Sequence, residues 1–489
     1  MNNSLKTLAG GWMLLLSTVI TSLLTLKLGA IYLSEEEIGL WIILRQTIGY
    51  LILLDFGISA SVGRIYSKEI HQAHSKSLNT ISSNIALIII IQTIVICLLG
   101  YYMIRNIGGW FELNELLNFN ASIILSCLIV TAVLRQFLRM KEGLLHANNQ
   151  YYVIGFSSVI SVWIELFTQF GCFMWGLGIY SLPSGQIAGS LIFFLIILYQ
   201  SSKKKYTIKF SVKDISLTRI REIIRVSFGF FFVGLFAQIL FLSQPVITGY
   251  LNGLASSTKY SVNMRGGFLL RSLMAKAVES WVPKWQALFD KGNTSTVRFE
   301  YINVCSLILN LTLVSAGFLI IANSTIVSLI YQESSYIGEV FDVLTAIFIA
   351  IHFFTGAMTI PFILAVKMSK RALVSLLQLI VSLLLSVYLG AKFREEGVVI
   401  GIVLGITSTG FIYNAIVSPK LIDMKVKIFW RIIIKNSFPY LFLLAAVGYT
   451  HILYTDKHII KMIAAVTGLT ILLYAHKDFI KKYVLKKNG

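Results

Sequence analysis

Residues 29–70 read GAIYLSEEEIGLWIILRQTIGYLILLDFGISASVGRIYSKEI, and this stretch contains the pattern that the whole chain repeats. An acidic turn at 34–37 separates two apolar stretches, and the second of these ends in a basic segment. The apolar stretch 39–61 is long enough for a membrane-spanning helix, which needs roughly 20 residues. The segment therefore predicts two spans joined by a turn on one side of a membrane, with a basic loop on the other side.

The composition of the chain supports a membrane protein. Of its 489 residues, 56% are hydrophobic and only 13% are charged, and the mean hydropathy is +0.78. Soluble proteins carry about 25% charged residues, so a soluble enzyme, a coiled coil and a disordered chain are excluded. The net charge of +20 indicates basic cytoplasmic loops rather than a nucleic-acid partner.

We predict an all-α polytopic membrane protein with about fourteen transmembrane helices, since span and loop together use roughly 30–35 residues. The predicted spans are 10–32, 39–61, 81–104, 118–138, 152–175, 182–200, 224–247, 262–283, 302–322, 338–364, 371–391, 397–418, 435–453 and 458–475. Asn303 and Asn310 in the ninth span are expected to make interhelical hydrogen bonds.

Basic residues are unequally divided between the loops. Roughly 31 Lys and Arg residues fall on the side of the N-terminus and roughly 7 on the other, which predicts that both termini are cytoplasmic. The basic segments 64–76, 135–143, 203–225, 284–298, 367–371 and 419–435 are taken as cytoplasmic loops.

The loop between spans six and seven is the longest cytoplasmic one and divides the chain. We expect an N-lobe of six spans and a C-lobe of six spans, related as parallel repeats, with two helices appended. The predicted parts are 1–200 (N-lobe), 201–223 (basic loop), 224–418 (C-lobe), 419–475 (spans thirteen and fourteen) and 476–489 (basic cytoplasmic tail).

Seven ionisable residues lie inside predicted spans: Arg45, Asp55, Glu165, Arg265, Arg271, Lys276 and Glu279. Each costs about 2.5–3.5 kcal/mol at the centre of a helix in lipid, so they must face each other or water. Two interpretations stay open. The charges pair internally, Lys276 with Glu279 and Arg45 with Asp55, or they line a cationic cavity for an anionic substrate. Arginine grips phosphate oxygens through two parallel hydrogen bonds, which suits the second interpretation.

Other candidate features are weaker. His352 lies within span ten and is either a proton relay or a core histidine. The run Glu35–Glu37 is either an acidic metal motif of a glycosyltransferase or an exposed turn, and the turn is favoured. The sequence contains neither a phosphate-binding loop nor a cluster of His and Cys with metal-ligand spacing. We therefore expect no catalytic residue, metal site or cofactor.

The quoted stretch resembles the polysaccharide-export flippases of the multidrug/oligosaccharidyl-lipid/polysaccharide superfamily, the O-antigen translocases of the Wzx type. The resemblance rests on three features: the motif Gly39-Leu40-Trp41, the run LLDFGI at 53–58 and the basic Arg64. The layout of six plus six spans with a basic central loop is also similar, as is TGYLNGLASSTKYSVNMRGG at 248–267.

This resemblance implies a flippase in the bacterial cytoplasmic (inner) membrane. It would move undecaprenyl-diphosphate-linked oligosaccharide from the inner to the outer leaflet by alternating access. It implies that Arg45, Arg265 and Arg271 hold the diphosphate. From the charges themselves we expect Lys276 to share this role, and Asp55, Glu165, Glu279 and His352 to balance charge or bind a coupling H⁺ or Na⁺. The expected partners are this lipid-linked glycan, membrane lipid and other polysaccharide-assembly membrane proteins. The alternatives are a peptidoglycan-precursor flippase, a drug or cation antiporter, and a membrane glycosyltransferase or polymerase.

Overall fold

The computed structural model describes most of the chain as helix. It covers residues 3–53, 62–63, 65–67, 75–148, 150–202, 211–279, 285–286, 288–289, 292, 294–365 and 368–453, with backbone alone at 273–279 and 441–453 among others. These residues form helices and turns and no strand. Two compact units are present, Met1–Thr258 and Lys259–Gly489. The predicted division into lobes at 201–223 stays a prediction.

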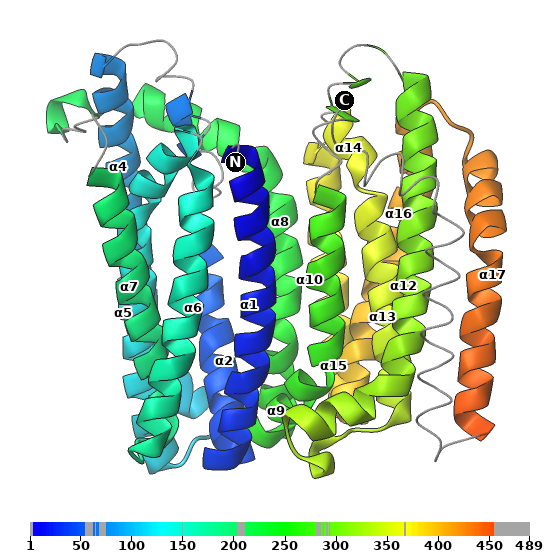
Figure 1. Ribbon diagram of the computed structural model, residues 1–489, viewed down its shortest axis with the longest axis horizontal. Coiled ribbons are helices and arrows are strands. Elements are labelled where there is room, and N and C mark those ends of the chain that lie inside the picture. Colours follow the sequence, from blue (N-terminus) through cyan, green and yellow to red (C-terminus); the bar gives the residue numbers. More distant parts are fainter. Residues whose placement is uncertain are drawn as a thin grey trace. The chain divides into compact units, whose positions relative to one another are not determined.

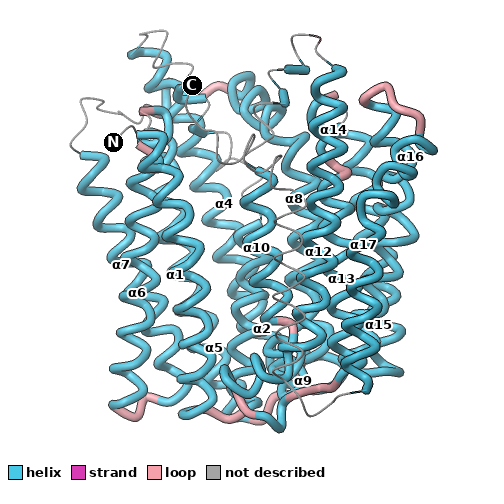
Figure 2. The backbone as a smooth tube through the Cα atoms, turned by 45° about the vertical axis from the view of Figure 1, so that its right-hand side comes forward, coloured by secondary structure: helices cyan, strands magenta, loops and turns pink. Residues whose placement is uncertain are grey.

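The first unit consists of long helices that lie side by side (Figures 1 and 2). Helix α6 packs between α1 and α7, while α5 contacts α2, α4 and α7, and α8 packs on α2. The helices of this unit are α1 (Asn3–Tyr32), α2 (Glu35–Ile52), α4 (Ser75–Trp110), α5 (Glu115–Ala147), α6 (Tyr151–Met174), α7 (Ser181–Ser202) and α8 (Leu217–Asn252), with short 3₁₀ turns at Gly178–Tyr180 and Val212–Asp214. Helix α9 (Leu254–Asn263) begins in this unit.

The acidic turn begins α2. The Ser34 hydroxyl accepts a hydrogen bond from the Glu37 backbone N–H at 3.2 Å, and the Glu37 carboxylate accepts from the Ser34 N–H at 2.9 Å. This reciprocal pair is a capping box, which satisfies two backbone donors that a helix start leaves free. Carboxylates in the first turn also favour the positive end of the helix dipole. The run Glu35–Glu37 is thus the first turn of a helix, whereas the sequence favoured an exposed turn outside the helices.

The motif Gly39-Leu40-Trp41 follows on α2 and meets the start of α9. A Cβ at Gly39 would overlap the backbone carbonyl of Leu254, so only glycine allows this approach. The Thr258 hydroxyl donates to the Glu35 carbonyl at 2.7 Å and holds the same contact. Leu40 and Trp41 are 0% and 5% exposed, which completes an apolar seam around the glycine.

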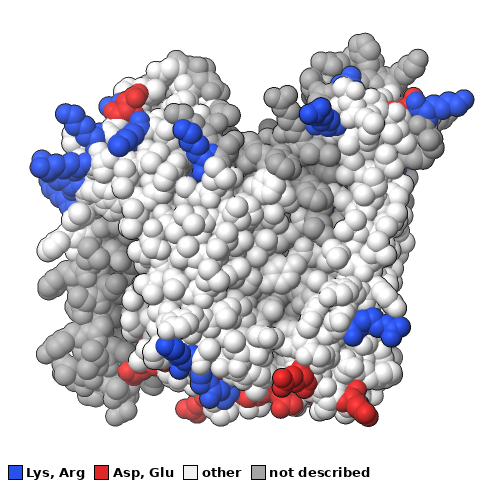
Figure 3. Space-filling model, turned by 180° about the vertical axis from the view of Figure 1, so that it is seen from behind, with Lys and Arg blue, Asp and Glu red and all other residues white. Residues whose placement is uncertain are grey.

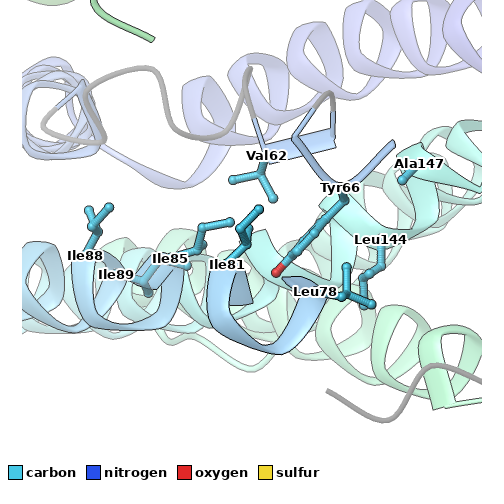
Figure 4. Packing of buried hydrophobic residues seen from close by; sticks show 9 residues of the cluster. All are labelled: Val62, Tyr66, Leu78, Ile81, Ile85, Ile88, Ile89, Leu144 and Ala147. Carbon is cyan, nitrogen blue, oxygen red and sulfur yellow. The ribbon is translucent and has the colours of Figure 1, made fainter. Parts of the chain in front are cut away.

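An apolar cluster holds the opposite end of the first unit. Val62 and Tyr66 lie against α4 and the end of α5 (Figure 4). Gly143 on α5 leaves the space that Val62 occupies. The buried members of this cluster are Val62, Tyr66, Leu78, Ile81, Ile85, Ile88, Ile89, Leu144 and Ala147. Branched aliphatic side chains dominate it, and hydrogen bonds that join Ser83 and Asn84 on α4 to residues 211–216 add to the packing at this end.

The second unit has the same character. Helix α12 packs on α13 and α17, α10 contacts α12 and α13, and α13 packs on α15. The helices are α10 (Arg265–Glu279), α12 (Thr294–Ile330), α13 (Glu339–Ala357), α14 (Ile360–Leu364), α15 (Met368–Ile406), a π-helical turn η5 (Thr407–Phe411), α16 (Ile412–Leu421) and α17 (Val426–Leu453). Asn310 on α12 donates to the Asn436 carbonyl on α17 at 3.3 Å, which confirms the interhelical bond predicted for this residue.

Helix α15 contains two predicted spans joined by a tight turn. Phe393 and Arg394 depart from helical geometry, and Arg394 has a φ of 52°. Beyond the turn, glycines at four-residue spacing (Gly397, Gly401, Gly405) face the backbone of Leu389, Ser386 and Ser382 on the first arm. A Cβ at any of the three would overlap that backbone. Small residues at this spacing permit close helix packing in lipid.

A buried polar network closes one end of the second unit. The Asp342 carboxylate accepts from Asn323 at 2.5 Å and from the Tyr336 hydroxyl at 2.6 Å. Asn323 also donates to the Asn263 carbonyl, and Asn263 donates to the Ser335 carbonyl. Burial and the bond to Asp342 raise the pKa of the Tyr336 phenol well above its usual range, so it remains a donor. The network ties the connection 331–338 to helices α9, α12 and α13.

The predicted all-α membrane fold is confirmed. Thirteen of the fourteen predicted spans coincide with described helix at least in part, and the last, 458–475, lies outside the described residues. Nine helical segments of the described part are long and apolar enough to cross a membrane, and one of them, Lys370–Leu421, contains two predicted spans. Two details differ from expectation. Helix α5 continues through 135–143, which we took as a loop, and span eight is broken at Met264 between α9 and α10.

We expect Gly39→Ala to destabilise the protein because the new methyl group must displace the Leu254 backbone. Overpacking of this kind costs about 1–3 kcal/mol. The measurement is the thermal unfolding midpoint of the detergent-purified protein. Gly11→Ala is the matched control, since nothing lies within 4 Å of a Cβ there. Equal midpoints for the two variants would contradict the proposed close contact.

Candidate functional site

Five charged side chains gather in the first unit. Arg135 on α5 interacts electrostatically with Glu165 on α6, with Glu142 and Arg139 on its own helix, and with Arg45 on α2. Two of these five, Arg45 and Glu165, are residues that the sequence singled out. The structure thus brings them together around an arginine that the sequence analysis assigned to a loop.

The helix period explains the arrangement on α5. Residues 135, 139 and 142 are spaced at i, i+4 and i+7, so they share one face of the helix. Helices α2 and α6 both contact α5, which carries Arg45 and Glu165 to the same place. The Arg135 guanidinium lies 5.6 Å from the centre of the Phe193 ring on α7, a cation–π contact that orients it.

Two members of this cluster are exposed. Arg45 and Arg135 are exposed, whereas Arg139, Glu142 and Glu165 are partly buried. A guanidinium group in contact with hydrocarbon would be strongly unfavourable. We therefore expect the two exposed guanidinium groups to face water.

The cluster contains more positive than negative charge. Three arginines face two glutamates, so the group carries a formal charge of +1. Glu165 is further held by Gln169, which donates to it at 3.4 Å and accepts from Thr25 on α1 at 2.8 Å. Glu165 is thus a fixed counter-charge to Arg135, and arginines outnumber glutamates among the described members of the cluster.

The second unit contains a second group of cations. His352 on α13 interacts electrostatically with Arg271 on α10 and Arg371 on α15. Arg265 begins α10 directly after the break at Met264 and is partly buried. The His352 ring lies between Phe348 and Phe353, with ring centres 5.8 and 5.9 Å away.

The remaining predicted site residues lie outside the description. This holds for Asp55 and for the side chains of Lys276 and Glu279, although α10 carries both of the latter positions. Sequence analysis missed Arg135, Arg139 and Arg371 because they fall in segments assigned to cytoplasmic loops. The spacing of 135, 139 and 142 on one helical face was the signal that could have revealed the first two.

Neither unit shows the constellation of a metal site. Within the described residues, no group of three or more His, Cys, Asp or Glu side chains could hold a metal ion. Figure 3 shows Lys, Arg, Asp and Glu near the ends of the helices on one face, with an uncharged band between them. Such a band is what a helix bundle presents to hydrocarbon.

Comparison with known proteins identifies the family. Residues 7–286, more than half of the chain, match the family described as "Polysaccharide biosynthesis protein". No curated protein sequence matches the chain.

Several solved structures share the fold. The lipid II flippase MurJ in an inward closed conformation has a TM-score of 0.73 at 17% identity, covering 99% of both chains. An inward-facing multidrug resistance MATE transporter has a TM-score of 0.64 at 14% identity, covering 83% of this chain and 95% of its own. A superfamily transporter from Pyrococcus furiosus, described as having a binding pocket of reverse polarity, has a TM-score of 0.60 at 15% identity, covering 86% and 97%.

These likenesses establish a transporter fold with about fourteen helices. The chain shares its fold with transporters of the multidrug/oligosaccharidyl-lipid/polysaccharide exporter superfamily. It belongs to the polysaccharide biosynthesis protein family.

Proposed function

We propose that the protein moves an undecaprenyl-diphosphate-linked oligosaccharide from the inner to the outer leaflet of the bacterial cytoplasmic membrane by alternating access. The observation that carries this proposal is the excess of arginine over carboxylate in the cluster around Arg135. A diphosphate is the part of such a substrate that hydrocarbon excludes most strongly. One guanidinium group binds two phosphate oxygens through parallel hydrogen bonds, and it stays charged at any physiological pH.

Each unit has its own candidate ligands for the diphosphate. They are Arg45, Arg135 and Arg139 in the first unit, and Arg265, Arg271 and Lys276 in the second. The substrate head enters at the cytoplasmic leaflet, the arginines replace the water around its phosphates, and a conformational change exposes it outside. The sugars need no specific pocket in this scheme, since the arginines bind only the diphosphate.

Between transport cycles, the carboxylates would balance the positive charge of the arginines. Glu165 neutralises Arg135 when the substrate is absent, and Asp55 and Glu279 are candidates for the same task or for a coupling H⁺ or Na⁺. His352 stays a candidate for charge balancing or coupling. Because moving one charge across 100 mV is worth about 2.3 kcal/mol, the membrane potential is able to drive the return step.

One second candidate has specific support. The likeness to the lipid II flippase covers 99% of both chains, and a peptidoglycan precursor presents the same diphosphate. A drug or cation antiporter fits less well, because a net positive cluster repels cations. A membrane glycosyltransferase or polymerase has no support from the family or from the structural likenesses, which are transporters or flippases.

We expect Arg45→Gln and Arg135→Gln each to lower translocation about 10- to 100-fold. A hydrogen bond to a charged group is worth about 1.5–3 kcal/mol, and each variant removes such bonds to phosphate. The assay uses proteoliposomes containing undecaprenyl-diphosphate glycan and measures the fraction that a glycosidase added outside removes with time.

Arg394→Gln is the control for these variants. The Arg394 side chain is 69% exposed and lies 3.7 Å from Glu395 at the turn of α15. Its loss should leave the rate unchanged. Wild-type rates in Arg45→Gln and Arg135→Gln would overturn the proposed role of the cluster.

The choice between the two glycan carriers is tested in the same proteoliposomes. We expect faster transfer of an undecaprenyl-diphosphate O-antigen or capsule repeat than of the peptidoglycan precursor, because the family match is to polysaccharide biosynthesis proteins. Imposing an H⁺ or Na⁺ gradient in parallel identifies the coupling ion. Transfer of the peptidoglycan precursor alone would favour the second candidate.

A further inference from the structure

Arg371 is a buried cation that the proposed cycle does not yet use. It lies in the first turn of α15 and is 5% exposed. Sequence analysis assigned it to a cytoplasmic loop at 367–371, but the structure places it inside the second unit, at the end of the helix. It is the second residue of Lys370–Leu421, a segment long and apolar enough to cross a membrane.

The guanidinium has few partners. Among the described residues its hydrogen bond goes from Nη1 to the Ser375 hydroxyl at 2.7 Å, while the buried Nε has none. Among the described residues, the ionisable groups with which it interacts are the Tyr413 phenol and the His352 imidazole, and neither is a carboxylate. A buried charge without a counter-ion is strongly unfavourable, so an anion would stabilise this position.

The chain just after the second arm of α15 comes close to the guanidinium at a glycine. Glycines at 397, 401 and 405 follow a four-residue spacing, and the next glycine on this face is Gly410, five residues on. The π-helical turn Thr407–Phe411 supplies that extra residue. A Cβ at Gly410 would overlap the Gln378 amide oxygen and lie 3.6 Å from Arg371 Nη2. Single π-turns often mark functional sites.

Gln378 is a second unsatisfied group at the same place. It is 9% exposed, and its amide oxygen has no hydrogen-bond partner. Exchange of the amide oxygen and nitrogen, which are alike in shape, would turn an NH₂ toward the position beside Gly410. The site then offers donors from both the guanidinium and the amide, a set that recognises an oxyanion.

We propose that Arg371 and Gln378, side by side next to Gly410, form a binding site for the phosphate of a membrane lipid. The inference rests on the proposed function and extends it. At the cytoplasmic end of the second unit, the site would hold the diphosphate of the substrate on entry, before the arginines deeper in the bundle take it. The same chemistry would also hold the phosphate of a bulk phospholipid, and the experiment separates these two sources.

The test compares the full chain with Arg371→Gln and Arg394→Gln in detergent. Three probes are titrated: undecaprenyl diphosphate, inorganic diphosphate and phosphatidylglycerol. The readouts are the dissociation constant and the thermal unfolding midpoint. We expect Arg371→Gln to weaken binding of undecaprenyl diphosphate about tenfold or more, which is about 1.4 kcal/mol, and Arg394→Gln to leave it unchanged.

The unliganded protein supplies an independent readout. Without ligand, the unfolding midpoint of Arg371→Gln should equal or exceed that of the wild type, because a buried and uncompensated charge has been removed. Addition of undecaprenyl diphosphate should raise the midpoint of the wild type but not that of the variant. A purely structural arginine would instead lower the midpoint, and that result would overturn the proposal. If Arg371→Gln fails to fold, Arg371→Lys keeps the charge without the planar fork and should weaken binding. Gly410→Ala, whose methyl group would displace the Gln378 amide, should weaken binding as well.

The three probes show which lipid supplies the phosphate. They also separate failure of the Arg371 site from failure of the proposed function. A loss confined to phosphatidylglycerol would assign the site to bulk lipid, and a loss for undecaprenyl diphosphate would assign it to the substrate. Unchanged affinities of Arg371→Gln for all three probes would refute the site even if Arg135→Gln impairs translocation. If the wild type ignores undecaprenyl diphosphate but binds phosphatidylglycerol through Arg371, the proposed function fails while the site stands.

Discussion

A guanidinium group keeps its charge in every environment, and hydrocarbon cannot solvate it. Each arginine inside this apolar chain must therefore find an anion, an aromatic face or water. The first unit uses all three. Glu165 and Glu142 oppose Arg135, the Phe193 ring lies beside it, and Arg45 is exposed. The positions of α2, α5 and α6 relative to one another are what make this possible.

Much of the fold could be predicted from the sequence because the bilayer allows few solutions. Length and apolarity reveal spans, since every backbone group in lipid must be bonded within its own helix. The capping box at Ser34 and Glu37 marks the start of α2, and the stripe Gly397, Gly401, Gly405 marks the close packing of two arms of α15. Local rules of this kind need no knowledge of distant neighbours.

The candidate site was only partly predictable. Arg45 and Glu165 stand out because they interrupt apolar runs, whereas Arg135 and Arg371 lie in basic segments that resemble loops. A basic segment at the end of a span has the same composition whether the helix stops there or continues inward. Whether the helix stops or continues is decided by its packing, and that packing depends on helices far away in sequence. The break at Met264 was hidden for the same reason, since neither glycine nor proline stands at the break.

The π-helical turn at Thr407–Phe411 also determines the direction in which the side chains of α16 point around the helix axis. Asn414 donates to the Thr355 carbonyl, and the Ser418 hydroxyl bonds the Met358 carbonyl, so both continue the face on which Gly410 lies. An α-helix advances about 100° per residue, so loss of the one extra residue would rotate these side chains away from α13 and α14. Related chains should therefore tolerate exchange of residues within this turn far better than any change in its length.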